Sequence, residues 1–123
     1  MENINKVFNI AKEKLLWDKT KNWSKGSVTY FDSLIDELEE IKVELDKGTK
    51  AHLEDELGDV LWCYFNILNN LEYENKIDTK AVFSRCAKKY EERVTGIKEN
   101  KNWSDIKEKQ KLELKTEEDS LKK

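Results

Sequence analysis

Two pairs of acidic residues, each with a spacing of three, are the residues of this sequence best placed to do chemistry. Glu37 and Glu40 form the first pair, and Glu56 and Asp59 form the second. Because residues three apart are neighbours on a helix surface, each pair would present two carboxylates side by side. Two such pairs on adjacent antiparallel helices would bring four carboxylates together. Clustered anions repel one another unless a cation lies among them, and oxygen ligands suit Mg²⁺, Mn²⁺ or Ca²⁺ better than zinc. The pattern predicts a metal site inside a helix bundle.

The position of these acids along their helices separates them from an ordinary solvated face. Glu37 lies three residues after Leu34, and Glu56 lies three residues after Leu53, so both acids fall on the apolar stripe itself. An ionised carboxylate in a helix interface is costly unless it is paired or bound to a metal. Gly58 in mid-helix costs about 1 kcal/mol against alanine, and close approach of a ligand or a neighbouring helix to the backbone would explain it. For the nearby acids Glu39, Glu54 and Asp55 we expect the alternative, a solvated surface.

The elements that must position these acids are helices. Apolar residues recur at the i, i+3, i+4, i+7 spacing of an amphipathic helix, and the chain has no proline and only four glycines. The spacing predicts helices over about 4–17, 28–47, 49–71 and 77–97, followed by a short helix over 103–114 that Ser104 would cap. Short connections favour antiparallel neighbours. We therefore expect an all-α fold, a four-helix bundle with a short C-terminal helix, over residues 1–114, and a charged, frayed tail over 115–123.

Composition excludes several other classes. At 123 residues the chain has the length of one domain, and its net charge of −3 gives no case for binding a nucleic acid polymer. No apolar run is long enough to span a membrane, and the first residues lack a signal-peptide pattern, so we expect a cytoplasmic protein. His52 is the only histidine, which rules out a histidine-rich metal site. Cys63 and Cys86 lie in apolar-periodic stretches and are expected to be ordinary buried thiols.

Two segments of the sequence resemble a known paired motif. Residues 36–41, Asp-Glu-Leu-Glu-Glu-Ile, and residues 54–62, Glu-Asp-Glu-Leu-Gly-Asp-Val-Leu-Trp, are similar to the ExxE and ExxD motifs of the MazG family of all-α nucleoside triphosphate pyrophosphohydrolases. The resemblance extends over about residues 15–111. It includes Trp17-Asp18-Lys19, the stretch Lys89-Tyr90-Glu91-Glu92-Arg93 and the segment 103–107, Trp-Ser-Asp-Ile-Lys. Leu15-Leu16 and Val94-Thr95 depart from the family pattern, which leaves the substrate preference open.

The resemblance implies a reaction and a set of site residues. Glu37, Glu40, Glu56 and Asp59 would be ligands of Mg²⁺, with Mn²⁺ as a substitute, and one of them would also serve as a general base. Water would attack the α-phosphorus of a nucleoside triphosphate and release pyrophosphate and a nucleoside monophosphate, a reaction suited to nucleotide-pool housekeeping. The resemblance also implies self-association as a dimer or a tetramer.

Three residues nearer the C-terminus are candidates for contacts with the nucleotide. Lys89 and Arg93 lie four apart on one helix face and would clamp the polyphosphate, since guanidinium suits bidentate phosphate contacts. Trp103 lies in a polar stretch and would stack on the base. The alternatives are an exposed basic face for Lys89 and Arg93, and an anchor between helix and core for Trp103.

Two other readings of the function remain open at this point. The first is a related enzyme with a narrow substrate range, acting on dUTP, dCTP or phosphoribosyl-ATP, in which the four-acid site would look the same. The second is a non-catalytic helical dimerisation module whose acids are merely solvated.

Overall fold

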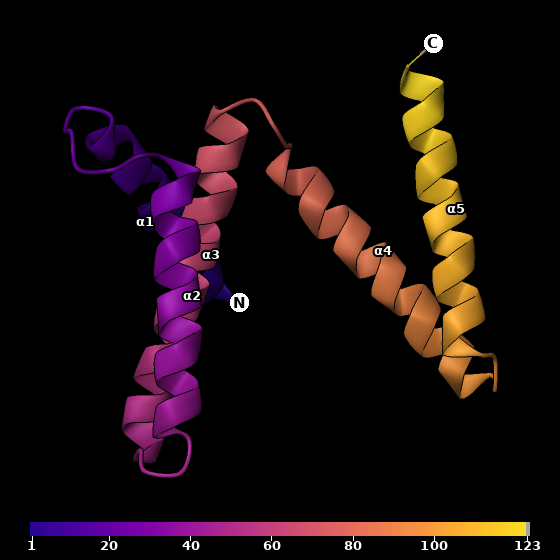
Figure 1. The fold of residues 1–123 in the computed structure, drawn as a ribbon, viewed down its shortest axis with the longest axis horizontal. Coiled ribbons are helices and arrows are strands. Elements are labelled where there is room, and N and C mark those ends of the chain that lie inside the picture. The colour runs from indigo at the N-terminus through magenta and orange to yellow at the C-terminus, as the bar shows by residue number, and fades with distance from the viewer. Residues whose placement is uncertain (123) are drawn as a thin grey trace. The chain divides into compact units, whose positions relative to one another are not determined.

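Five α-helices make up the computed structural model, which describes residues 1–122 (Figure 1). Their bounds are α1 Glu2–Asp18, α2 Ser27–Glu44, α3 Lys50–Tyr73, α4 Thr79–Lys98 and α5 Trp103–Leu121. No strand occurs in the described residues, so the predicted all-α class is confirmed. None of the helices in this part of the chain is long and apolar enough to cross a membrane.

The chain divides into two compact units. The first, Met1–Thr79, contains α1, α2 and α3, and the second begins at Lys80 and contains α5 with nearly all of α4. The packing of four helices into one bundle, the domain limits at residues 114 and 115, and self-association stay predictions.

In the first unit, α3 is the central element, and both α1 and α2 pack against it (Figure 1). Its buried residues all lie between Cys63 and Asn70, in the C-terminal half of the helix. Phe8 of α1 meets Phe65 edge-on, with ring centroids 5.2 Å apart. The buried apolar residues of the unit are Ala11, Leu15, Tyr30, Ile41, Cys63, Phe65, Ile67 and Leu68.

The register between α2 and α3 is fixed at one end by a carboxylate that caps a helix. Glu74, just past the end of α3, accepts hydrogen bonds from the backbone N–H and the hydroxyl of Ser27, both at 3.0 Å. These bonds hold the pKa of Glu74 below its usual value, the backbone bond being the largest cause. Gly26 is the N-cap residue of α2 and has a φ of 81°, and a Cβ there would lie 2.8 Å from Glu74 Oε2. The capping bonds therefore hold the start of α2 beside the end of α3, and the close contact favours glycine at position 26.

A second polar contact ties α1 to α2. Asp18, buried at the end of α1, accepts hydrogen bonds from the indole N–H of Trp23 at 3.1 Å and from the hydroxyl of Tyr30 at 3.0 Å. Lys14, one turn earlier on α1, forms an ion pair with the same carboxylate. A buried carboxylate with this many partners positions the 19–26 loop without leaving an uncompensated charge.

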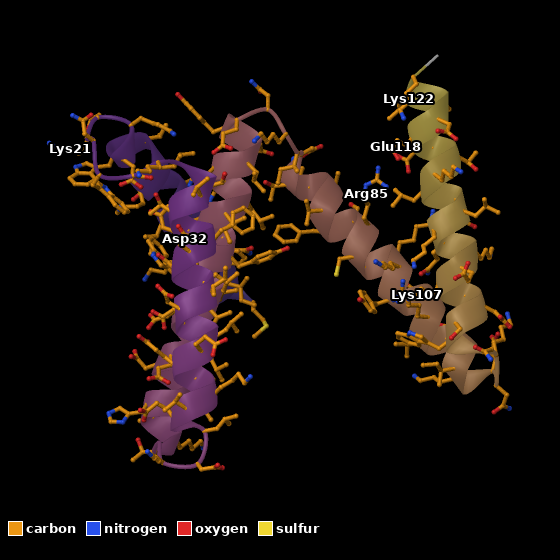
Figure 2. All side chains as sticks on the ribbon, in the orientation of Figure 1. Lys21, Asp32, Arg85, Lys107, Glu118 and Lys122 are labelled. Carbon is orange, nitrogen blue, oxygen red and sulfur yellow. The ribbon has the colours of Figure 1, made fainter. Side chains whose placement is uncertain are left out.

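The second unit is an antiparallel pair of helices. Near the connecting loop, Ile106 of α5 packs directly onto Gly96 of α4, where an added Cβ would lie 2.1 Å from Ile106 Cδ1. Further along, Arg93 Nε donates to Gln110 Oε1 at 2.7 Å. At the far end, Arg85 forms a bidentate ion pair with Glu117, with bonds of 3.0 and 2.6 Å. Figure 2 shows Arg85 between the two helices.

The last helix differs from its prediction in two ways. It is not short, because α5 continues to Leu121 instead of ending at Leu114, so most of the expected tail is helical. Its N-cap is Asn102, whose side chain accepts from the N–H of Ser104 at 2.8 Å, whereas Ser104 was expected to be the cap. The last residue of the expected tail, 123, lies outside the described residues.

We predict that Gly96→Ala destabilises the protein by about 1–3 kcal/mol, because overpacking a close helix contact costs that much. Ile106→Val removes the Cδ1 atom that an alanine methyl group would strike, so the double variant should recover most of the loss. Urea unfolding of both single variants and the double variant measures the coupling. Additive effects of the two substitutions would contradict the contact.

Candidate functional site

The four predicted acids lie between α2 and α3, away from the end that Glu74 caps. Glu37 and Glu40 are on α2, and Glu56 and Asp59 are on α3. The side chains of Glu37 and Glu56 are half-buried, whereas Glu40 and Asp59 are exposed. The Oε2 atoms of Glu37 and Glu56 are buried and have no hydrogen-bond partner. A buried carboxylate oxygen without a partner is costly. A hydrogen-bond donor or a bound cation would therefore stabilise both atoms.

The electrostatics of Glu37 show that the acids lie within reach of one another. Burial raises the pKa of Glu37 above its usual value, and repulsion from Asp59, Glu40 and Glu56 raises it further. Asp36 adds a smaller repulsion from the same helix. The other three acids therefore lie within electrostatic range of Glu37.

Cys63 belongs to the same neighbourhood. Burial raises the pKa of its thiol, and the charges of Glu37 and Asp59 raise it further. A thiol held in its neutral form is a poor nucleophile, which leaves the carboxylates as the reactive groups here. Cys63 is buried as predicted, whereas Cys86 of α4 is exposed, so the expectation of a buried thiol is wrong for Cys86.

The acids do not enclose an ion as they stand. Within residues 1–122, no three His, Cys, Asp or Glu side chains are grouped so that they could hold a metal ion. Four neighbouring carboxylates without a counter-ion repel one another, and two of these four point to the surface. The donor types and the two unpartnered buried oxygens fit a hard cation, while the ligand shell itself is not formed.

Gly58 lies between the two acids of α3, and its surroundings differ from one expectation. An added Cβ at this glycine would meet no atom within 4 Å. Within the first unit, no neighbouring helix therefore approaches the backbone there, so close packing against α1 or α2 does not explain the glycine.

A stripe of polar residues continues from the acids along α3, and the sequence analysis missed it. Cys63, Asn66 and Asn70 follow Asp59 at spacings of four, three and four, which places all of them on one helix face. Asn66 and Asn70 are almost completely buried. Asn70 donates to the carbonyl of Asn66 at 2.7 Å, while Asn66 Oδ1 has no partner. The spacings of three and four residues in the sequence were the signal that could have revealed this stripe.

The candidate phosphate-binding residues lie in the second unit. Arg93 is buried, with 6% of its surface exposed, and its guanidinium carbon is 5.3 Å from the ring centroid of Tyr90 and 5.4 Å from that of Trp103. Lys89 is exposed, with its ammonium 5.8 Å from the Tyr90 ring. The structure therefore brings Arg93 and Trp103 into contact and places Lys89 beside the same tyrosine.

Residues 25–96 match the family of the MazG nucleotide pyrophosphohydrolase domain. This segment is more than half of the chain. The chain belongs to this family. No curated protein and no solved structure gives a significant match to the chain.

The matched segment, residues 25–96, includes some of the candidate site residues and leaves others out. The MazG domain segment contains all four acids together with Lys89 and Arg93, whereas Trp103 and the whole of α5 lie beyond its end. Both motifs that carried the resemblance, and the two helices that hold them, therefore belong to the shared domain. The match establishes the nucleotide pyrophosphohydrolase family for the segment that holds both motifs.

The raised pKa of Glu37 predicts how stability depends on pH. A carboxyl with a raised pKa binds its proton more tightly in the folded state, so its favourable contribution is present at acid pH and is lost as the pH rises through the folded pKa. We predict that Glu37→Gln, in the absence of divalent cations, stabilises the protein at neutral pH and has much less effect at acid pH.

Urea unfolding across this pH range measures the difference between Glu37→Gln and wild type. Glu39→Gln is the matched control, because Glu39 is exposed on the same helix. An effect of Glu37→Gln that does not change with pH, or one that Glu39→Gln reproduces, would contradict the repulsion among the acids.

Proposed function

We propose that the protein is a Mg²⁺-dependent nucleoside triphosphate pyrophosphohydrolase that converts ribo- or deoxyribonucleoside triphosphates into the monophosphate and pyrophosphate. The observation that carries this proposal is the pair of buried, unpartnered carboxylate oxygens on Glu37 and Glu56, set among like charges in the matched MazG segment. A helical dimerisation module would have no reason to bury such oxygens. We infer a housekeeping role in the nucleotide pool.

Glu37, Glu40, Glu56 and Asp59 are the residues that would hold the Mg²⁺, or Mn²⁺ in its place. Carboxylate oxygens are the ligands these ions prefer. A bound divalent cation neutralises phosphate charge and lowers the pKa of a coordinated water. In its absence the four acids repel one another, so binding of the cation would relieve this repulsion.

The proposed reaction is a hydrolysis at the α-phosphorus. The water oxygen forms a bond to the α-phosphorus, the bond from that phosphorus to the bridging oxygen breaks, and pyrophosphate leaves. The water proton passes to a carboxylate of the cluster, which acts as general base, and then to solvent. A carboxylate is the natural base here, because the only histidine, His52, is exposed and Cys63 is held neutral.

Lys89 and Arg93 would contact the polyphosphate, and Trp103 the base. The guanidinium of Arg93 is fixed by Gln110 and by two aromatic rings, which lowers the entropy lost on binding an anion. Trp103 is 38% exposed, so part of its ring remains accessible.

Substitution of Trp103 by alanine should cost roughly 1–3 kcal/mol of stacking on the base and change the preference among bases. Unchanged preference in a nucleotide panel would make this residue a structural anchor only.

Self-association as a dimer or tetramer is part of the proposal. Val28, Phe31, Ile35 and Leu38 follow one another at helical spacing on α2, and each is between 44% and 59% exposed. A continuous apolar face of this kind is typical of an interface. Light scattering that finds only monomer at micromolar concentration would contradict this part.

We predict that Glu56→Gln abolishes Mg²⁺-dependent release of pyrophosphate from nucleoside triphosphates while the protein remains folded. The substitution keeps the shape of the side chain and removes a charged ligand. The control is Glu54→Gln, two residues earlier on the exposed face of α3, which should keep full activity. The assay measures pyrophosphate and monophosphate over a panel of nucleotides that includes dUTP and dCTP. Full turnover by Glu56→Gln, or orthophosphate and diphosphate as products, would contradict the proposal.

A further inference from the structure

The end of the first unit where α1 passes into the 19–26 loop presents three half-exposed aromatic side chains. Trp17 lies in the last turn of α1, Trp23 lies in the loop, and Tyr73 is the last residue of α3. These residues are 53%, 49% and 55% exposed, respectively. Aromatic residues that serve only in packing bury most of their surface. The three rings therefore offer contact area that the fold itself does not use.

Lysine ammonium groups lie over the two indole rings. Lys14 is 4.2 Å from the ring centroid of Trp23 and 5.5 Å from that of Trp17. Lys21 is also 5.5 Å from the Trp17 ring, and Figure 2 shows Lys21 on the loop between α1 and α2. Both indole rings thus lie within reach of one ammonium group, and a second one approaches from the loop.

The third ring joins the same end of the unit through Lys19. Its ammonium group lies 4.5 Å from the ring centroid of Tyr73, and in the chain it lies between Trp17 and Lys21. We call this group of side chains the aromatic–lysine surface. Its members are Lys14, Trp17, Lys19, Lys21, Trp23 and Tyr73.

The exposed charge at this end is positive, although the chain as a whole has a net charge of −3. Residues 12–25 contain five lysines and two acids, Glu13 and Asp18. Asp18 is buried and bonded to Trp23 and Tyr30, so Glu13 is the acid of this segment that faces solvent. A local excess of positive charge attracts anions. The prediction against a nucleic acid polymer depends on the net charge, which averages over this excess.

Two acids near the end of α3 bind helix N-termini instead of these lysines. Glu72 Oε1 accepts a hydrogen bond from the N–H of Thr79, the first residue of α4, at 2.9 Å. Glu74 caps α2. Among the described residues, no ion pair within 4 Å involves Lys19 or Lys21. Their exposed ammonium groups are therefore available to an anionic partner.

We propose that the aromatic–lysine surface binds single-stranded nucleic acid, with bases stacked on the rings and phosphates paired with the lysines. Stacking on aromatic side chains within a positively charged surface is how proteins bind single strands without sequence preference. A duplex keeps its bases stacked on one another, and an acidic peptide would pair with the lysines without needing exposed rings. The single strand is the partner that uses both features.

The lysines can serve both the free and the bound surface. A base that stacks on Trp17 displaces an ammonium group from the ring face, and the flexible lysine stem lets that group turn to the phosphate of the same nucleotide. The surface lies at the end of α2 and α3 that Glu74 caps, away from the four acids. The inference therefore does not rest on the proposed hydrolysis.

The test is fluorescence anisotropy of a labelled single-stranded oligonucleotide, titrated with the full chain in the presence of a chelator and at several salt concentrations. Trp17→Leu keeps an apolar side chain and removes the ring, so it should weaken binding about fivefold or more, whereas Trp17→Phe should keep most of the affinity. Lys19→Ala/Lys21→Ala should reduce the slope of log affinity against log salt by about one or more.

The matched control is Lys42→Ala/Lys47→Ala, which removes two exposed lysines at the other end of α2. It should change the affinity less than about twofold. Absence of binding at low salt, an equal loss in the control variant, or equal affinity for duplex and single strand overturns the proposal.

Three further arms separate the alternatives. Displacement of the oligonucleotide by an equal concentration of a nucleoside triphosphate overturns the proposal in favour of a site for single nucleotides. Tighter binding to vesicles of anionic phospholipid, lost in Trp17→Leu, overturns it in favour of a lipid surface. Glu56→Gln should bind the oligonucleotide as wild type does, so a failure of hydrolysis and a failure of this surface are observed separately.

Discussion

Repulsion among carboxylates between α2 and α3 is the constraint on which the arrangement of the first unit depends. Burial and four neighbouring acids raise the pKa of Glu37, and the buried Oε2 atoms of Glu37 and Glu56 lack hydrogen-bond partners. A helix pair with such an interface would separate unless other contacts held it. The Glu74 cap on Ser27 and the packing of α1 and α2 on α3 supply those contacts. The fold thus tolerates a costly cluster because its stability comes from elsewhere in the unit.

This distribution of stabilising and destabilising contacts is what a binding site requires. Buried polar atoms without partners are rare in folded proteins, and each one needs an explanation. Here the unpartnered oxygens fall in the segment shared with the MazG family.

The sequence predicted the helices well because apolar spacing is a direct consequence of burying one helix face. The same spacing singled out Glu37 and Glu56, since an acid on an apolar stripe must be buried. The end of α5 was missed because its last residues, Leu121 among them, are exposed and leave no apolar stripe to follow. Asn66 and Asn70 were missed because amides on a buried face carry no charge to attract notice. Contacts such as those of Asp18 with Trp23 and Tyr30 depend on loop geometry, which spacing does not encode.

The measurement that tests the central claim most directly is thermal unfolding of the wild-type chain at neutral pH with Mg²⁺ or Mn²⁺, compared with sodium chloride of the same ionic strength. A cation that binds only the folded state raises the melting temperature by mass action, whereas salt screening acts alike for all ions of that strength. The account predicts a rise with divalent cation well beyond that with sodium chloride, saturating as the site fills. Equal melting temperatures in the two salts would contradict a cation site among the four acids.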